Sequence, residues 1–197
     1  VDAFRYYFLR AIPFGNDGSF SWEDMSARYT SELANDFGNL ASRLAAMIEK
    51  YCGGKVPAQA KDVGLAEALQ ATVDKADAAM VALDFQGGIN AIMDYCKQVN
   101  GFVTVKEPWI LAKDPANQGV LEEVLYNTAE SLRALAVLLH PVMPATTEIL
   151  WESLGAKESL GEIGSQEISK VATWGQLPQG ATVTKTPVLF PRLEVKE

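Results

Sequence analysis

SWEDMSARYTSELANDFGNLASRLAAMIEKY, residues 21–51, carries the longest helical pattern in the chain. Its apolar side chains recur at steps of three or four residues, the period of an amphipathic α-helix. Ser21 with Asp24 three residues later resembles a capping box, and Gly53-Gly54 provides a stop. The apolar positions are Met25, Tyr29, Leu33, Phe37, Leu40, Leu44, Ile48 and Tyr51. We expect one long helix here, with an apolar stripe that needs partner helices.

Four more segments show the same period, at about residues 65–80, 85–107, 118–140 and 144–154. Pro108 ends the second of them, and Pro144 suits the first turn of the last. The connections are short, so neighbouring helices can pack antiparallel. The sequence therefore predicts an all-α fold, with a helical bundle over residues 21–155.

The bundle has a shorter segment on each side. Residues 1–20 begin with a helical fragment, Val1 to Arg10, and then turn at Pro13, Gly15 and Gly18. Residues 156–197 lose the helical period and are rich in Gly, Ser, Thr and Pro, with an extended candidate at Val188-Leu189-Phe190. We expect three parts: 1–20, the bundle 21–155 and an irregular tail 156–197.

Charge and composition exclude several classes of protein. The 25 acidic and 17 basic residues give a net charge of −8 and a pI of about 4.8, which argues against a basic nucleic-acid-binding surface and against DNA binding. Any contact with a polyanion must be small and local. No apolar run is longer than that from Ala134 to Leu139, which is too short to span a bilayer, and no signal peptide opens the chain. We expect a cytoplasmic protein with no membrane partner.

Residues suited to catalysis are scarce. The single histidine, His140, precedes Pro141 at a helix end, where capping or packing is expected. Cys52 and Cys96 lack a CxxC spacing, and a core of this size needs no disulfide. The chain contains neither a GxxxxGKS nor a GxGxxG loop. We expect no catalytic, metal or cofactor site in this chain, and a binding or interaction module.

Asn39 and Arg43 form the first candidate site. Their i, i+4 spacing places both on one helix face, about 80–120° from the apolar stripe. A planar amide beside a guanidinium can hydrogen-bond the edges of a nucleic-acid base. The alternative is a solvated face on which Arg43 pairs with Glu32 or Asp36.

Trp109, directly after Pro108, forms the second candidate site. An indole held on a stiff turn is a good platform for stacking an unpaired base. The alternative is a tryptophan that fills the end of the bundle between two helices.

Several segments, taken in order, resemble the methionyl-tRNA synthetase family in the part that follows its catalytic core. Residues 1–10 and 12–20 look like the segment after the family's Lys-Met-Ser-Lys-Ser loop, and ANDFGNLASR (34–43) looks like its first anticodon-domain helix. PWILAK (108–113) matches its Pro-Trp motif. LHPVMP (139–144), WESLG (151–155), WGQLP (174–178) and LFPRL (189–193) fit the closing helices and the tail.

This resemblance implies a function for the candidate sites. It implies a bundle of the class I synthetase anticodon-binding type that recognises the CAU anticodon of methionine tRNA. Asn39 and Arg43 would read base edges, Trp109 would stack a base, and Pro108 would fix the indole. The parent enzyme would ligate methionine to its tRNA using ATP, with Mg²⁺. This chain would be a fragment that ends the stem at residues 1–20 and packs its tail on the bundle and on the absent catalytic domain.

One departure from the family and two alternatives accompany this interpretation. Thr104-Val105 stands where the family commonly has an acidic pair, so any rejection of wrong anticodons by charge would fall to Glu107. The alternatives are the helical domain of another class I synthetase, for cysteine, leucine, isoleucine or valine, and a helical protein-interaction module without an RNA site.

Phe4, Tyr7 and Phe8 are expected to form an apolar patch exposed in the isolated chain.

Overall fold

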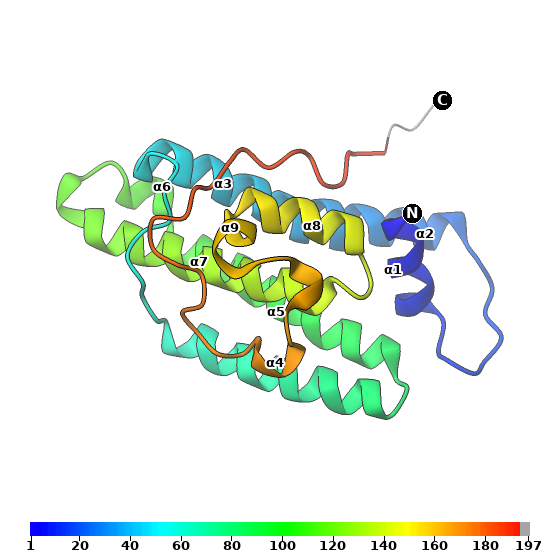
Figure 1. Cartoon of the computed structure of the whole chain (residues 1–197). Helices are drawn as coiled ribbons and strands as arrows, with labels where there is room; N and C mark the ends of the chain where they lie inside the picture. The colour runs from blue at the N-terminus through cyan, green and yellow to red at the C-terminus, as the bar shows by residue number, and fades with distance from the viewer. Residues whose placement is uncertain (194–197) are drawn as a thin grey trace.

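The computed structural model describes residues 1–193, which form helices and contain no β-strand (Figure 1). The prediction of an all-α helical bundle is confirmed. None of the helices in this range combines the length and the apolarity that crossing a bilayer requires. The elements are α1 (Asp2–Ala11), α2 (Trp22–Arg28), the π-helix η1 (Tyr29–Gly38), α3 (Asn39–Cys52), α4 (Val63–Val81), α5 (Phe85–Lys106), α6 (Pro108–Leu111), α7 (Gln118–Leu139), α8 (Pro144–Ser153) and α9 (Ala156–Leu160), with short 3₁₀ turns at Pro115–Asn117, Ile163–Ser165 and Ile168–Lys170.

Helix α7 is the centre of the bundle. Every residue from 124 to 139 is buried, and α3, α4, α5, α6 and α8 all pack against it (Figure 1). A helix buried on all sides is mostly apolar around its circumference, and the polar side chains that α7 buries, such as Glu130 and Arg133, are hydrogen-bonded. Its central position makes α7 the scaffold on which the other helices are placed.

The expected single α-helix over residues 21–51 is wrong in its middle third. The helix is continuous, but Tyr29–Gly38 adopts the wider π form between α2 and α3. The apolar positions Met25, Tyr29, Leu33 and Phe37 recur at strict steps of four, which overshoot an α-helical turn of 3.6 residues by about 40° each. A π-helix has more residues per turn, so it holds this stripe on one face. Asn39 begins α3 immediately after it.

The helix ends lie where the sequence predicts them. The Ser21 hydroxyl accepts a hydrogen bond from the Asp24 N–H at 3.2 Å, and Gly53 ends α3 in the left-handed conformation, with φ 59°. His140 directs Nδ1 at the Thr147 hydroxyl, 2.9 Å away. Both expected helix boundaries and the packing role expected of His140 agree with the structure.

The tail is irregular but attached to the bundle by backbone hydrogen bonds. Val56 N–H donates to the Ala181 carbonyl and Val183 N–H to the Gly54 carbonyl, both at 2.9 Å. The extended candidate at residues 188–190 does not form a strand. Proline stands on both sides of it, at Pro187 and Pro191, and proline has no N–H to donate to a ladder.

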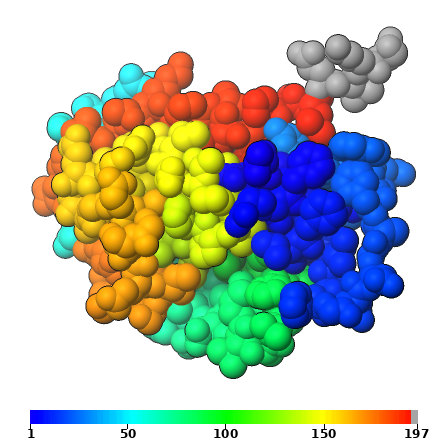
Figure 2. All heavy atoms as spheres, turned by 45° about the vertical axis from the view of Figure 1, so that its right-hand side comes forward, coloured from blue at the N-terminus to red at the C-terminus, as the bar shows by residue number. Residues whose placement is uncertain are grey.

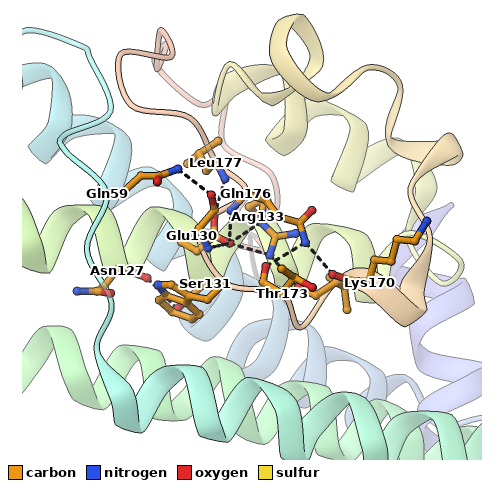
Figure 3. A network of polar contacts seen from close by, with 12 residues as sticks. Gln59, Asn127, Glu130, Ser131, Arg133, Lys170, Thr173, Gln176 and Leu177 are labelled. Carbon is orange, nitrogen blue, oxygen red and sulfur yellow. Dashed lines mark hydrogen bonds and ion pairs between the residues drawn. The ribbon is translucent and has the colours of Figure 1, made fainter.

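A buried ionic network fixes the tail to α7 (Figure 3). The Glu130 carboxylate accepts a hydrogen bond from Arg133 Nε at 2.9 Å and from three tail N–H groups, those of Gly175, Gln176 and Leu177, at 3.0, 3.1 and 2.9 Å. Arg133 also donates to the Val171 carbonyl at 2.8 Å. Both side chains of the pair are almost fully buried, at 0% and 1% exposure. Sequence reasoning missed this network, because a Glu and an Arg three residues apart are common on solvated helix faces.

Both cysteines are free thiols. Burial raises the pKa of Cys96 to about 12 and also raises the pKa of the half-buried Cys52. Only the thiolate reacts with aromatic disulfides, and at pH 8 roughly one Cys96 in ten thousand is ionised. We expect Cys96 to resist such a reagent until denaturant is added, while Cys52 reacts slowly in the folded chain. The absorbance of the released thiol measures both rates, with Cys96→Ala as control. Two thiols reacting at one rate without denaturant would contradict this expectation.

Candidate nucleic-acid interface

The candidate residues come from two helices, α3 and α6, which the side chains of Arg43 and Trp109 bring together. Asn39, the first residue of α3, is exposed, and Arg43 follows one turn later and is half-buried. Pro108 is buried at the start of α6, and Trp109 is half-buried beside it. The structure therefore places both sequence-predicted sites on neighbouring elements.

Arg43 and Trp109 are in direct contact. The guanidinium carbon of Arg43 lies 5.3 Å from the centre of the indole ring, a cation–π arrangement. The alternative that paired Arg43 with Glu32 or Asp36 is wrong. Glu32 binds Arg10 at 3.0 Å and Arg28 at 3.6 Å instead. Arg43 therefore lies over an aromatic face, and no carboxylate within residues 1–193 forms an ion pair with it.

A sharp turn between α5 and α6 presents Trp109. Glu107 ends α5 in the left-handed conformation, with φ 46°, which costs a residue with a Cβ about 1–2 kcal/mol. A residue before proline avoids the right-handed helical region, so Pro108 helps to set this turn. The Glu107 carbonyl then accepts the Ile110 N–H at 2.7 Å and starts α6. The turn places the indole next to α3, with Glu107, Thr104 and Val105 exposed nearby along the chain.

A hydrogen-bonded cluster fixes η1, the segment that leads into Asn39, to α1. The Tyr6 hydroxyl donates to Glu32 Oε2 at 2.6 Å, and Arg10 donates to Glu32 Oε1 at 3.0 Å. Burial and the Glu32 carboxylate both raise the pKa of Tyr6, so its hydroxyl stays protonated. The N-terminal segment therefore holds the helix that carries the candidate residues.

The C-terminal tail also lies beside Asn39, which the sequence did not predict. The tail residues 188–190 and Arg192 line a cavity together with Asn35, Gly38, Asn39 and Ser42. The only sequence signal for it was the LFPRL motif at 189–193, to which the pattern alone assigned no role.

The expected aromatic patch at the N-terminus is partly correct. Phe4 and Phe8 are 42% and 44% exposed, but Tyr7 is buried, with its ring 5.4 Å from that of Phe20. Trp22 adds to the patch and is 66% exposed. Phe20 packs between these rings, which gives a cluster of aromatic side chains open to solvent on one side.

The side chains at this interface are suited to binding a ligand through non-covalent contacts. The interface offers an amide, a guanidinium and an indole, which can hydrogen-bond and stack planar groups. Within residues 1–193, no three His, Cys, Asp or Glu side chains are arranged to hold a metal ion.

Two families match the chain. The anticodon-binding domain of tRNA ligases matches residues 62–174, more than half of the chain, and this range includes Trp109. The methionine group of class I tRNA synthetases matches residues 1–45, which include Asn39 and Arg43.

Individual relatives agree with these families. A methionine–tRNA ligase of Streptomyces coelicolor is 58% identical over 203 residues, and one of Bacillus subtilis is 38% identical. The match covers all of this chain in both, and 38% and 30% of the relatives. The free form of Mycobacterium tuberculosis methionyl-tRNA synthetase superposes with a TM-score of 0.83 at 31% identity, covering 100% of this chain and 39% of that one. Its form bound to methionyl-adenylate gives 0.80, at coverages of 96% and 37%. The chain thus spans about a third of the length of these proteins.

Proposed function

Because the chain belongs to the family of anticodon-binding domains of tRNA ligases, we propose that it recognises the CAU anticodon of methionine tRNA. The contact between Arg43 and Trp109 carries this proposal, since it joins a base-reading side chain to a stacking platform. The match of all of this chain to methionine–tRNA ligases supports the choice of tRNA.

In this proposal, Arg43 and a base of the anticodon exchange places on the indole. A guanidinium over an indole contributes about 0.5–2 kcal/mol, depending on its exposure, and a base stacked on an aromatic ring contributes about 1–3 kcal/mol. A base that stacks at the upper part of this range displaces Arg43 from the indole. This exchange also frees Arg43, with Asn39, to hydrogen-bond base edges, while Pro108 holds the indole in place.

The whole protein would be a methionine–tRNA ligase that uses ATP, with Mg²⁺, in a part of the sequence outside this chain. We divide the chain into the end of a connecting stem at 1–20, the anticodon-binding bundle at 21–155 and a tail at 156–197. The exposed aromatic cluster around Phe4, Phe8 and Trp22 would pack against the catalytic domain. The proposal requires neither DNA nor a membrane, and it places the protein in the cytoplasm, where tRNA serves translation.

The test is a titration of the chain with anticodon stem-loops. The CAU loop is expected to bind tightest, ahead of loops for cysteine, leucine, isoleucine and valine. With one or two phosphate contacts, affinity should fall less than about tenfold between roughly 50 and 200 mM salt, whereas six contacts would cost a few hundredfold. Tighter binding of another loop would assign the chain to a different synthetase. Binding of no loop above background would favour a protein-interaction module.

A further inference from the structure

A cavity of about 400 Å³ lies between helix α4 and the tail. Figure 2 shows the tail segment around residue 168 in orange, next to the turquoise-green residues of α4. The α4 residues at 70, 73, 74 and 77 line the cavity, and their spacing of i, i+3, i+4 and i+7 places them on one helix face. None of the lining residues belongs to the candidate nucleic-acid interface. The cavity is therefore a separate feature of the surface.

The floor of this cavity is apolar. Its buried side chains, each at most 7% exposed, are Val73 and Ala76 of α4, Ile92 of α5, Leu138 of α7 and Val142 of the loop that follows. Ile168 of the tail is 41% exposed and continues the apolar lining to the surface. A concave site with an apolar lining and a few polar groups is the usual form of a small-molecule site.

The rim of the cavity is acidic. Asp74 and Asp77 are exposed there, and neither forms an ion pair within residues 1–193. Among the described residues, no lysine, arginine or histidine lines the cavity. Carboxylates at neighbouring positions of a helix repel each other, and a cation between them relieves this repulsion. The charge at the rim therefore favours a cationic ligand.

We propose that this cavity binds a small organic cation, a primary ammonium group on a short apolar arm. Cavities of about 150 Å³ accommodate benzene, so this one has room for a phenyl ring with an alkyl arm. The arm lies on the apolar floor. The three N–H donors of the ammonium group reach Asp74 and Asp77 at the rim, where the group stays in contact with water and avoids the cost of full desolvation. This inference does not rest on the proposed function.

The test is an NMR titration of the chain with 2-phenylethylammonium, which is a cation at pH 7. Ring currents of the bound phenyl group should shift the methyl signals of Val73, Ile92 and Ile168. We expect the double variant Asp74→Asn, Asp77→Asn to bind this cation about fivefold more weakly, because two exposed ion pairs are lost. The neutral analogue 2-phenylethanol should bind the variant and the unchanged chain equally.

Asp17→Asn, Asp94→Asn is the matched double control. Both residues are exposed, neither lines the cavity, and their replacement changes the net charge by the same amount. Equal weakening in the two double variants would reduce the effect to the charge of the whole chain and overturn the site. Methyl shifts absent from the cavity, or largest beside the N-terminal aromatic cluster around Phe4 and Trp22, would overturn it as well.

Discussion

Replacing Glu130 by Gln is expected to lower the free energy of unfolding by about 3–5 kcal/mol, the cost of breaking a buried charge pair from one side. Arg133 would remain buried without its anion. The new amide would also turn an N–H₂ group toward N–H groups of the tail, where only an oxygen can accept. Urea denaturation measures the loss directly, and the melting temperature should fall by roughly 6–20 °C.

Glu152→Gln is the matched control for this prediction. It removes the same charge from a pair with Lys157, at 2.9 Å, in which both side chains are about half exposed. Such surface pairs contribute about 0–1 kcal/mol. Equal losses in the two variants would show that the buried pair has no special role.

The Glu130 variant should also loosen the tail. Three consecutive N–H groups, at residues 175–177, lose their carboxylate acceptor. Their hydrogen exchange should speed up more than that of α7, which keeps its own helical hydrogen bonds. Unchanged exchange at these residues would show that the network does not hold the tail in place.

Replacing Trp109 by Ala is expected to weaken binding of the CAU stem-loop by about 1–3 kcal/mol, or roughly 5- to 150-fold, because the stacking platform is removed. Trp109→Phe should lose less, since a smaller ring still stacks. Trp22→Ala is the control, because Trp22 is exposed and lies in the N-terminal aromatic cluster. Equal affinity of the unchanged chain and Trp109→Ala would overturn the stacking role.

Stability must be measured for the same variants. Trp109 packs partly against the core, so its removal also lowers the free energy of unfolding. Binding is therefore compared at a temperature at which unfolding curves show every variant to be folded.

The helices could be predicted because their signals are local. The pattern expected near residues 65–80 became α4 at Val63–Val81, and the one ended by Pro108 became α5 at Phe85–Lys106. The π-helix was missed because apolar steps of four residues also occur along ordinary α-helices, and a drift of about 40° per step over so few turns does not distinguish the two helix types by itself. The buried Glu130–Arg133 pair was missed because its acceptors and donors come from the distant tail.

The sequence by itself determined that this protein is a helical bundle with a net charge of −8, and that Asn39 and Arg43 share a helix face. These properties depend on composition and on spacings of a few residues, which elementary helix geometry converts into structure. Only the tertiary structure decided that Arg43 lies over Trp109 and that the tail residue Arg192 lines the same cavity as Asn39. Those contacts join residues far apart in the chain, and their formation depends on how whole elements pack, which no local spacing encodes.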